Sequence, residues 1–197
     1  MPNSNPDSDM KRYIADALLE HLWRNPADKV KVTEFCAHAG ISRSTFYLHF
    51  DSAYDVLQYI EDGLLADLEE MESRGMERHL VEGSEKDLDA LRDIVSFLSS
   101  RLKIVRVLCG ANRDAAFTAR LTKRVHARVR ALADKYWPLA LPAQKDLVSA
   151  YVGGGSLATI KWWAMHPDEF TEEEVLRSML LYGRSAIGLI SGKAESK

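Results

Sequence analysis

The fold is decided by one stretch of this sequence, Ala39-Gly40-Ile41-Ser42-Arg43-Ser44-Thr45-Phe46-Tyr47-Leu48-His49-Phe50. Gly40 is a typical residue for the end of a helix, and Ser42 is a typical N-cap for the start of the next one. The second helix would bury Ile41, Phe46 and Phe50 and would turn its polar side chains outward. A helix–turn–helix needs this distribution, because one side of its second helix packs inside the protein while the other fits the major groove of DNA.

The polar residues around this turn are the candidate DNA contacts: Lys31, Thr33, Ser42, Arg43, Ser44, Thr45, Tyr47 and His49. Arg43 is the strongest candidate for a base contact, because a guanidinium can donate two hydrogen bonds to O6 and N7 of guanine. Ser44 and Thr45 can reach bases or phosphates. Each candidate also has a structural interpretation: Arg43 and His49 as solvated surface residues, Tyr47 as a packing residue, and those before Gly40 as a helix cap and solvated charges.

The bulk composition is that of a globular protein of one or two domains, with 197 residues, 46% hydrophobic and 28% charged. Two cysteines, Cys36 and Cys109, indicate no disulfide framework and favour a reducing cytoplasm. No apolar run approaches the roughly 20 residues that cross a bilayer, so we expect no membrane association. Residues 1–8 are polar and acidic, which predicts a disordered tail and not a signal peptide.

The charge balance permits DNA binding without favouring it. The formal net charge is -3, and the first 55 residues carry no excess of cations. Between Lys29 and Phe50, however, three cations stand against the single anion Glu34. Local charge matters most here, because screening limits its reach to about 10 Å at ordinary salt.

The whole chain is expected to be all-α, with about nine helices, since almost every segment has helical spacing and none has sustained two-residue alternation. A three-helix helix–turn–helix unit is expected over residues 9–55 and a larger helical bundle over 56–197. One expected helix starts at residue 52, and its pattern weakens before residue 75. The other expected helices cover residues 9–24, 34–39, 42–50, about 84–98, 101–108, 114–137, 142–165 and 171–187.

The opening stretch is preceded by Lys31-Val32-Thr33-Glu34-Phe35-Cys36-Ala37-His38. Together these segments resemble the DNA-binding signature of the tetracycline-repressor (TetR) family, and the resemblance covers roughly residues 9–65. Tyr151-Val152-Gly153-Gly154-Gly155-Ser156-Leu157, followed by Lys161-Trp162-Trp163, is similar to one branch of that family. The resemblance implies an all-helical homodimer whose N-terminal units bind a palindromic operator in double-stranded DNA. It also implies that 56–197 binds a small-molecule effector and forms the dimer.

For the DNA-binding unit, the resemblance implies that Tyr47 and His49 contact phosphates. Two positions depart from the family pattern. Ala53 stands where the family usually has a lysine that contacts a phosphate, and Lys31 stands where a small hydroxyl residue is usual, with Thr33 just inside. One phosphate contact fewer lowers the salt dependence of binding by about one unit, and Lys31 is placed to replace that contact.

The bundle holds two further sets of candidates. Gly153-Gly154-Gly155 lies within an expected helix at a cost of about 1 kcal/mol per glycine, which favours close helix approach across a dimer or beside a ligand over a local kink. The candidate dimer residues are Gly153, Gly154, Trp163, Met179, Leu180 and Ile187. The candidate effector-pocket residues are Phe97, Val105, Leu108, Phe117, Tyr151 and Trp162, although an aromatic stripe is more often simply core.

A basic run, Arg120, Lys123, Arg124, Arg128 and Arg130, has two interpretations. It is either a second DNA surface or, as we favour, a helix face that offsets the acidic segment from Asp62 to Glu72. Enzyme motifs are missing from the sequence, which has no glycine-rich phosphate loop, no His-Glu-x-x-His and no paired-cysteine site. We therefore expect no enzymatic activity, no cofactor and no metal.

The sequence thus predicts a cytoplasmic, homodimeric, TetR-type transcriptional regulator, most simply a repressor that responds to an unidentified small molecule. A competing hypothesis is a helical regulator that acts through a protein partner, with weak or no DNA binding. Ala53 and the acidic balance favour that alternative. A small-molecule carrier or helical enzyme is a third, weaker hypothesis.

Overall fold

The structure, a computed structural model, describes residues 6–24, 30–73, 85–110 and 115–188. Within these ranges all regular structure is helical, which confirms the all-α prediction. The first helix begins three residues earlier than expected, so residues 6–8 are helical and not part of a tail, while residues 1–5 lie outside the description. The nine helices are α1 (Pro6–Arg24), α2 (Val32–Ala39), α3 (Arg43–His49), α4 (Ala53–Ser73), α5 (Glu85–Ser99), α6 (Leu102–Cys109), α7 (Ala115–Tyr136), α8 (Pro142–Met165) and α9 (Glu172–Gly188).

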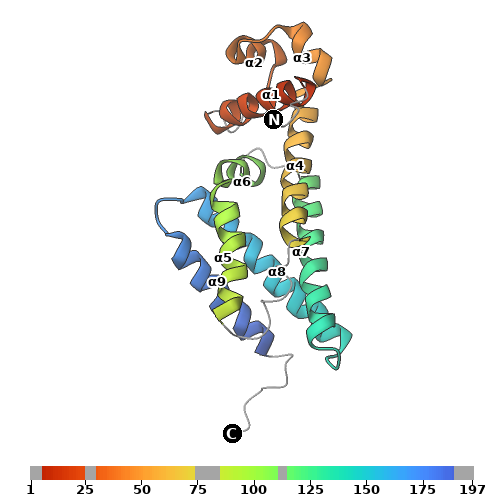
Figure 1. The fold of residues 1–197 in the computed structure, drawn as a ribbon, viewed down its shortest axis with the longest axis vertical. Coiled ribbons are helices and arrows are strands. Elements are labelled where there is room, and N and C mark those ends of the chain that lie inside the picture. The colour runs from red at the N-terminus through yellow and green to blue at the C-terminus, as the bar shows by residue number, and fades with distance from the viewer. Residues whose placement is uncertain (1–5, 25–29, 74–84, 111–114, 189–197) are drawn as a thin grey trace.

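The helices form an elongated molecule with α1, α2 and α3 at one end (Figure 1). Helix α4 leads away from that end and runs beside α7, while α5, α8 and α9 make up the other end. The short helix α6 lies between the two groups. No helix of the described ranges is long and apolar enough to span a bilayer.

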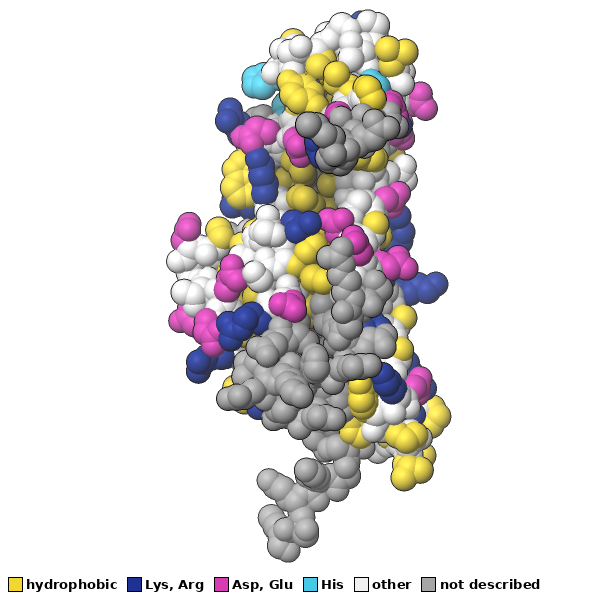
Figure 2. All heavy atoms as spheres, viewed as in Figure 1, with side chains coloured by type: hydrophobic (Ala, Val, Ile, Leu, Met, Phe, Trp, Pro, Cys, Tyr) yellow, Lys and Arg dark blue, Asp and Glu magenta, His cyan; other side chains and the backbone are white. Residues whose placement is uncertain are grey.

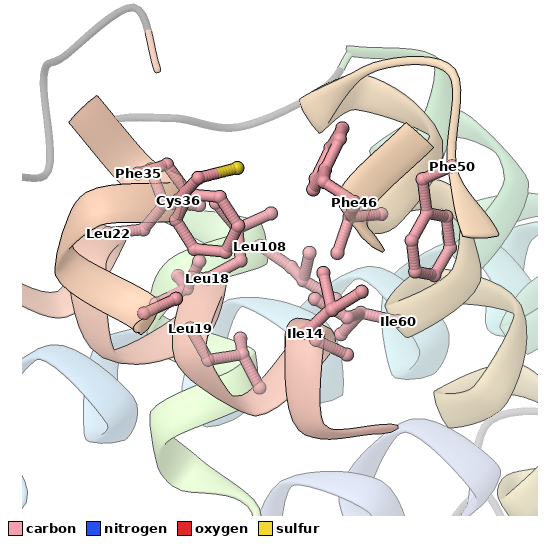
Figure 3. Packing of buried hydrophobic residues seen from close by; sticks show 14 of the residues in the cluster. Ile14, Leu18, Leu19, Leu22, Phe35, Cys36, Phe46, Phe50, Ile60 and Leu108 are labelled. Carbon is pink, nitrogen blue, oxygen red and sulfur yellow. The ribbon is translucent and has the colours of Figure 1, made fainter. Parts of the chain in front are cut away.

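The first hydrophobic core joins the N-terminal helices to the bundle. Ile14, Leu18 and Phe35 pack with Phe46 of α3, and Figure 3 shows these side chains converging between the helices. The same cluster also takes in residues from the middle helices: Val56, Ile60 and Leu64 of α4, Val107 and Leu108 of α6, and Phe117 of α7. The expected boundary between residues 55 and 56 therefore does not coincide with a gap in the packing.

A second core fills the space between α5, α6, α8 and α9, where Val95, Val105, Trp163 and Leu176 are buried. Helix α6 contributes to both cores, because Val105 belongs to the second core and Leu108 to the first. A change in the bundle that shifts α6 will therefore also disturb the packing of the N-terminal helices.

Ion pairs line the contact between α4 and α7. The Glu61 side chain is only 2% exposed and pairs with Arg120 at 2.5 Å, while Arg120 also bonds Asp62 at 2.9 Å. One turn along α7, Arg124 lies 3.7 Å from Glu69. These pairs support the interpretation of the basic run as a face that offsets the acidic part of α4.

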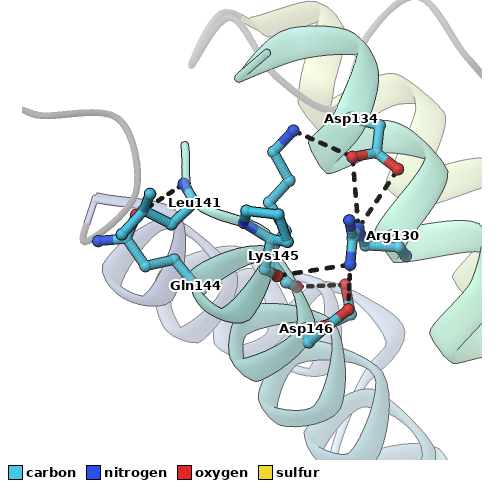
Figure 4. A network of polar contacts seen from close by, with 8 residues as sticks. Arg130, Asp134, Leu141, Gln144, Lys145 and Asp146 are labelled. Carbon is cyan, nitrogen blue, oxygen red and sulfur yellow. Dashed lines mark hydrogen bonds and ion pairs between the residues drawn. The ribbon is translucent and has the colours of Figure 1, made fainter. Parts of the chain in front are cut away.

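Helices α7 and α8 are fixed to each other at the end of the molecule farthest from α3. The ammonium of the buried Lys145 bonds Asp134 at 3.0 Å, and Arg130 pairs with both Asp134 and Asp146 (Figure 4). The hydrogen bond from Lys145 is the main cause that lowers the pKa of Asp134. Where α7 meets α8, hydrophobic side chains gather on the surface (Figure 2), and Leu139 there is 97% exposed.

Candidate nucleic-acid interface

The turn between α2 and α3 is built as the sequence predicts. Gly40 has a left-handed backbone (φ 66°), and its amide and that of Ile41 both donate to the carbonyl of Cys36. Ser42 is the N-cap of α3, and its hydroxyl accepts a hydrogen bond from the amide of Thr45 at 2.9 Å. Because glycine reaches this backbone conformation without strain, the chain can end one helix and start the next within three residues of Ala39.

Helix α3 is divided into a buried and an exposed side. Phe46 is fully buried and its ring lies 5.9 Å from that of Phe35 on α2, in an edge-to-face arrangement. On the opposite side Arg43 and Tyr47 are exposed, with the Arg43 guanidinium 6.0 Å from the centre of the Tyr47 ring. The buried side fixes the helix, so the exposed side is held in a defined direction.

A side chain of helix α1 contacts the backbone just before the turn between α2 and α3. The Tyr13 hydroxyl donates a hydrogen bond to the carbonyl of Ala39 at 2.7 Å, at the point where α2 ends. This bond stabilises the end of α2 just before the turn, and with it the position of α3.

The structure brings all eight predicted contact residues to the same end of the molecule. Arg43, Ser44 and Tyr47 are exposed on α3, while Lys31 and Thr33 are exposed at the start of α2. Lys31 forms an exposed ion pair with Glu34 at 3.0 Å, a type of pair that contributes little to stability, so its ammonium is only weakly held.

Two of the predicted contact residues, Ser42 and His49, already make side-chain contacts within the protein. The hydroxyl of Ser42 caps α3 and lies 2.7 Å from the hydroxyls of both Ser44 and Thr45, so it orders its neighbours. His49 is only 15% exposed, and its Nδ1 lies 2.7 Å from a carboxylate oxygen of Asp7. Lys11 pairs with the other oxygen of Asp7 at 3.0 Å.

Two further residues lie at this end that the sequence pattern does not predict, Asp7 and Leu48. Asp7 falls in the segment expected to be a tail, although Pro6 followed by acidic residues is typical of a helix N-terminus. Leu48 is 80% exposed beside Tyr47, where an apolar side chain can meet the methyl group of thymine. No pattern in the sequence distinguishes Leu48 from a buried leucine.

The six predicted effector-pocket residues are not gathered around one cavity. Leu108 and Phe117 are buried in the first core and Val105 in the second, while Phe97 is half-buried under the guanidinium of Arg101. The other two, Tyr151 and Trp162, are exposed on α8, and Tyr151 lines an open groove on that side of the subunit. A hollow of about 650 Å³ lies along α7 and is lined by Ala115, Thr118, Ala119, Thr122, Lys123 and His126.

The predicted dimer residues fall on two sides of the bundle. Gly153 and Trp163 lie inside the subunit, which corrects their placement at an interface. A Cβ on Gly153 would lie 2.7 Å from Cδ2 of His126 on α7, and the Trp163 indole donates to the carbonyl of Phe170 at 3.0 Å. Leu180 is half-buried against the second core. The side chain of Ile187 lies outside the described residues.

Gly154 and Met179 line an open groove between α8 and α9 with a volume of about 370 Å³, and Tyr151, Tyr182 and Gly183 lie there too. The groove lining is rich in apolar and small residues, and the same two helices also carry the exposed Leu147 and Leu181. Within the described residues no group of three or more metal-ligating side chains is placed to hold a metal ion.

No protein-family model matches the sequence, and a search of curated proteins finds no similar sequence. Solved structures are similar over almost the whole chain. A transcriptional regulator (TerR/AcrR family) from Aquifex aeolicus VF5 matches with a TM-score of 0.66 at 16% identity, covering 92% of this chain and 99% of its own.

Two other regulators have the same architecture. A TetR transcriptional regulator from Streptococcus agalactiae 2603V has a TM-score of 0.61 at 20% identity and covers 90% of this chain and 94% of its own. The dihydroxyacetone kinase operon activator DhaS has a TM-score of 0.57 at 13% identity and covers 92% and 96%. The nine helices of the described ranges, with a helix–turn–helix at one end, give this chain the fold of the TetR family of transcriptional regulators.

Proposed function

We propose that this chain is a sequence-specific DNA-binding transcriptional regulator of the TetR type, acting as a homodimer in the cytoplasm. The observation that carries the proposal is the division of α3, with Phe46 fully buried and Arg43, Ser44 and Tyr47 exposed. A helix held by one side and polar on the other is what the major groove accepts. The likeness to regulators of the same fold supports the role.

In this proposal Arg43 contacts guanine, and Ser44, Thr45 and Leu48 contact neighbouring bases. Tyr47, His49 and Lys31 contact phosphates and set the orientation of α3 on the duplex. Base contacts of this kind contribute about 1–3 kcal/mol each to discrimination, whereas phosphate contacts strengthen binding to every sequence.

The second copy would dock on the outer surface of α8 and α9. A Cβ built on Gly154, Gly155 or Gly183 meets no atom within 4 Å, so packing within the subunit does not explain these glycines. Each costs about 1 kcal/mol within a helix. Their small size permits close approach by another helix, and a two-fold dimer would present two α3 helices to successive major grooves about 34 Å apart.

An effector bound in the bundle would control DNA binding through α6 and α4. Besides sharing both cores, α6 touches α1 directly: Lys103 pairs with Glu20, and the Arg106 guanidinium lies 4.2 Å from the centre of the Trp23 ring. An effector that favours one position of α6 would therefore shift the population of α1–α3 arrangements. We propose repression as the default output, although the sign depends on where the operator lies.

Fluorescence anisotropy with a labelled duplex from the DNA upstream of the chain's own gene tests the proposal. The wild-type protein should bind tightly and lose affinity steeply with salt, and the double variant Arg43→Ala/Tyr47→Ala should lose at least about a hundredfold. Lys135→Ala is the matched control, since Lys135 is exposed in the last turn of α7, far from α3, and should leave binding unchanged. Absence of binding to any duplex at low salt would favour a regulator that acts through a protein partner.

A further inference from the structure

One contact at the DNA-facing end ties together two residues that are 42 positions apart, the carboxylate of Asp7 and Nδ1 of His49, at 2.7 Å. Asp7 stands in the first turn of α1, and His49 is the last residue of α3. Lys11 holds the second oxygen of the same carboxylate at 3.0 Å. The contact joins the start of α1 to the end of the helix that we propose enters the groove.

This geometry fixes which ring nitrogen carries the proton. Lys11, and after it His49, lowers the pKa of Asp7 below its usual value, so the carboxylate stays ionised and can only accept a hydrogen bond. Nδ1 of His49 must therefore carry a proton and donate it. Nε2 makes no hydrogen bond within the described residues and is not among the buried atoms without a partner, so it reaches solvent.

The fixed proton on Nδ1 limits what Nε2 can do. A neutral imidazole has one N–H, so with the proton on Nδ1 the nitrogen that faces solvent presents a lone pair. A lone pair repels phosphate oxygens. Nε2 can donate to a phosphate only after the ring takes up a second proton and becomes imidazolium, which an unperturbed histidine does near pH 6.5.

We propose that Asp7 is a positioning residue that makes His49 contact DNA phosphate only as the imidazolium, so that DNA binding takes up one proton per subunit. The proposal rests on the function proposed above, and it adds that the pH of the cell controls the affinity for DNA. The bound imidazolium lies between two anions, the Asp7 carboxylate and the phosphate, and at the C-terminus of α3, where a helix favours positive charge.

Other charged groups on the surrounding helices are placed differently. Around α3 they are Lys11 on α1, Glu34 and His38 on α2, Arg43 on α3 itself, Asp51 after it, and Asp55 in the first turn of α4. None of these makes a hydrogen bond or an ion pair with His49, and Glu34 is paired with Lys31. Asp7 is therefore the charged group that the His49 ring contacts in the free protein.

Anisotropy titrations at pH 6 and pH 8 with the same upstream duplex test this. If binding takes up a proton, the wild-type Kd should be about tenfold larger at pH 8 than at pH 6, since charge-assisted hydrogen bonds are the strong ones. Calorimetry should give different binding enthalpies in phosphate and in Tris, because the two buffers release protons with different enthalpies. The difference should correspond to the uptake of up to two protons per dimer. Asp9→Asn, which removes a carboxylate from the same turn of α1, should keep the wild-type pH dependence.

Two variants separate positioning from a merely structural role. In Asp7→Asn the amide can donate to Nδ1, which frees the ring to carry its proton on Nε2, so this variant should bind about as well at pH 8 as at pH 6. In His49→Gln a neutral amide can donate to the phosphate, and binding should again lose its pH dependence. Circular dichroism checks that both variants are folded.

The outcomes distinguish the two proposals. If His49→Gln keeps the wild-type pH dependence, or if Asp7→Asn weakens binding equally at both pH values, the positioning role is wrong while DNA binding stands. If the wild-type protein binds no duplex at either pH, both proposals fall.

Discussion

The two exposed surfaces of this protein, on α3 and on α8 with α9, differ in composition although both face away from their cores. The surface of α3 carries Arg43, Ser44 and Tyr47, side chains that hydrogen-bond in water and in a DNA groove alike. The surface of α8 and α9 carries glycines together with exposed residues such as Leu181. The two surfaces are exposed alike, so their different composition is what distinguishes the two partners that we propose, DNA for the first surface and a second copy of the chain for the other.

The largest expected effect comes from placing a charge on the α8–α9 surface. Leu181→Asp should give a monomer in size-exclusion chromatography with light scattering and should lower DNA affinity at least about a hundredfold, because two linked half-sites become independent. Leu139→Asp is the control, since Leu139 is even more exposed (97% against 63%) but lies elsewhere. A dimeric Leu181→Asp protein would remove the distinction between the two surfaces.

The neighbouring glycines Gly153 and Gly154 should respond differently to the same substitution, although both belong to α8. Gly153→Ala should lower the free energy of unfolding by about 1–3 kcal/mol in urea titrations, because the new methyl group would meet His126 at 2.7 Å. Gly154→Ala should leave subunit stability unchanged or higher and should instead weaken the dimer, since its methyl group points into open space on the proposed interface. Equal losses of subunit stability would contradict this assignment of the two sides.

A smaller effect is expected from the cap of α3. Ser42→Ala removes the acceptor for the Thr45 amide and should cost about 1 kcal/mol of stability, measured by thermal unfolding. Affinity for DNA should fall for all sequences alike, because Ser42 orders α3 and does not touch bases. Ser42→Asp should restore stability, as aspartate is also a good N-cap; a loss as large as that of alanine would show that the hydroxyl acts in another way.

The smallest effect concerns Ala53, where the family usually has a lysine. Ala53→Lys should steepen the dependence of log affinity on log salt by about one unit per subunit, through one added phosphate contact. Ala143→Lys adds the same charge at the far end of the molecule, in the first turn of α8, and should change the slope little. Equal slopes for both variants would mean that position 53 does not face the duplex.

Most of the architecture is predictable from the sequence because it depends on local signals. Gly40, Ser42 and the spacing of Phe46 and Phe50 place the turn and the buried side of α3, and the structure has them as expected. The glycine run shows the limit of such signals. Gly153 and Gly154 have the same local context, yet one faces α7 and the other faces outward.

What could not be predicted depends on how helices are rotated and on contacts across the chain. Tyr151 and Trp162 are aromatic like Phe117, but only Phe117 is buried. The rotation of α8 against α7 decides which side of α8 is buried, and no local pattern gives that rotation. The contact between Asp7 and His49 was missed for a similar reason, because no periodicity relates residues 42 positions apart.

The first core also sets a rule for engineering. Because Leu108 and Phe117 are buried in the same cluster as Phe46, a truncated piece ending after α4 would expose part of that cluster to water. A chimera that joins the N-terminal helices to a foreign helical bundle must therefore carry α6 and the start of α7 as well, or replace the buried residues that they contribute. The N-terminal helices and the bundle therefore cannot be exchanged as separate units.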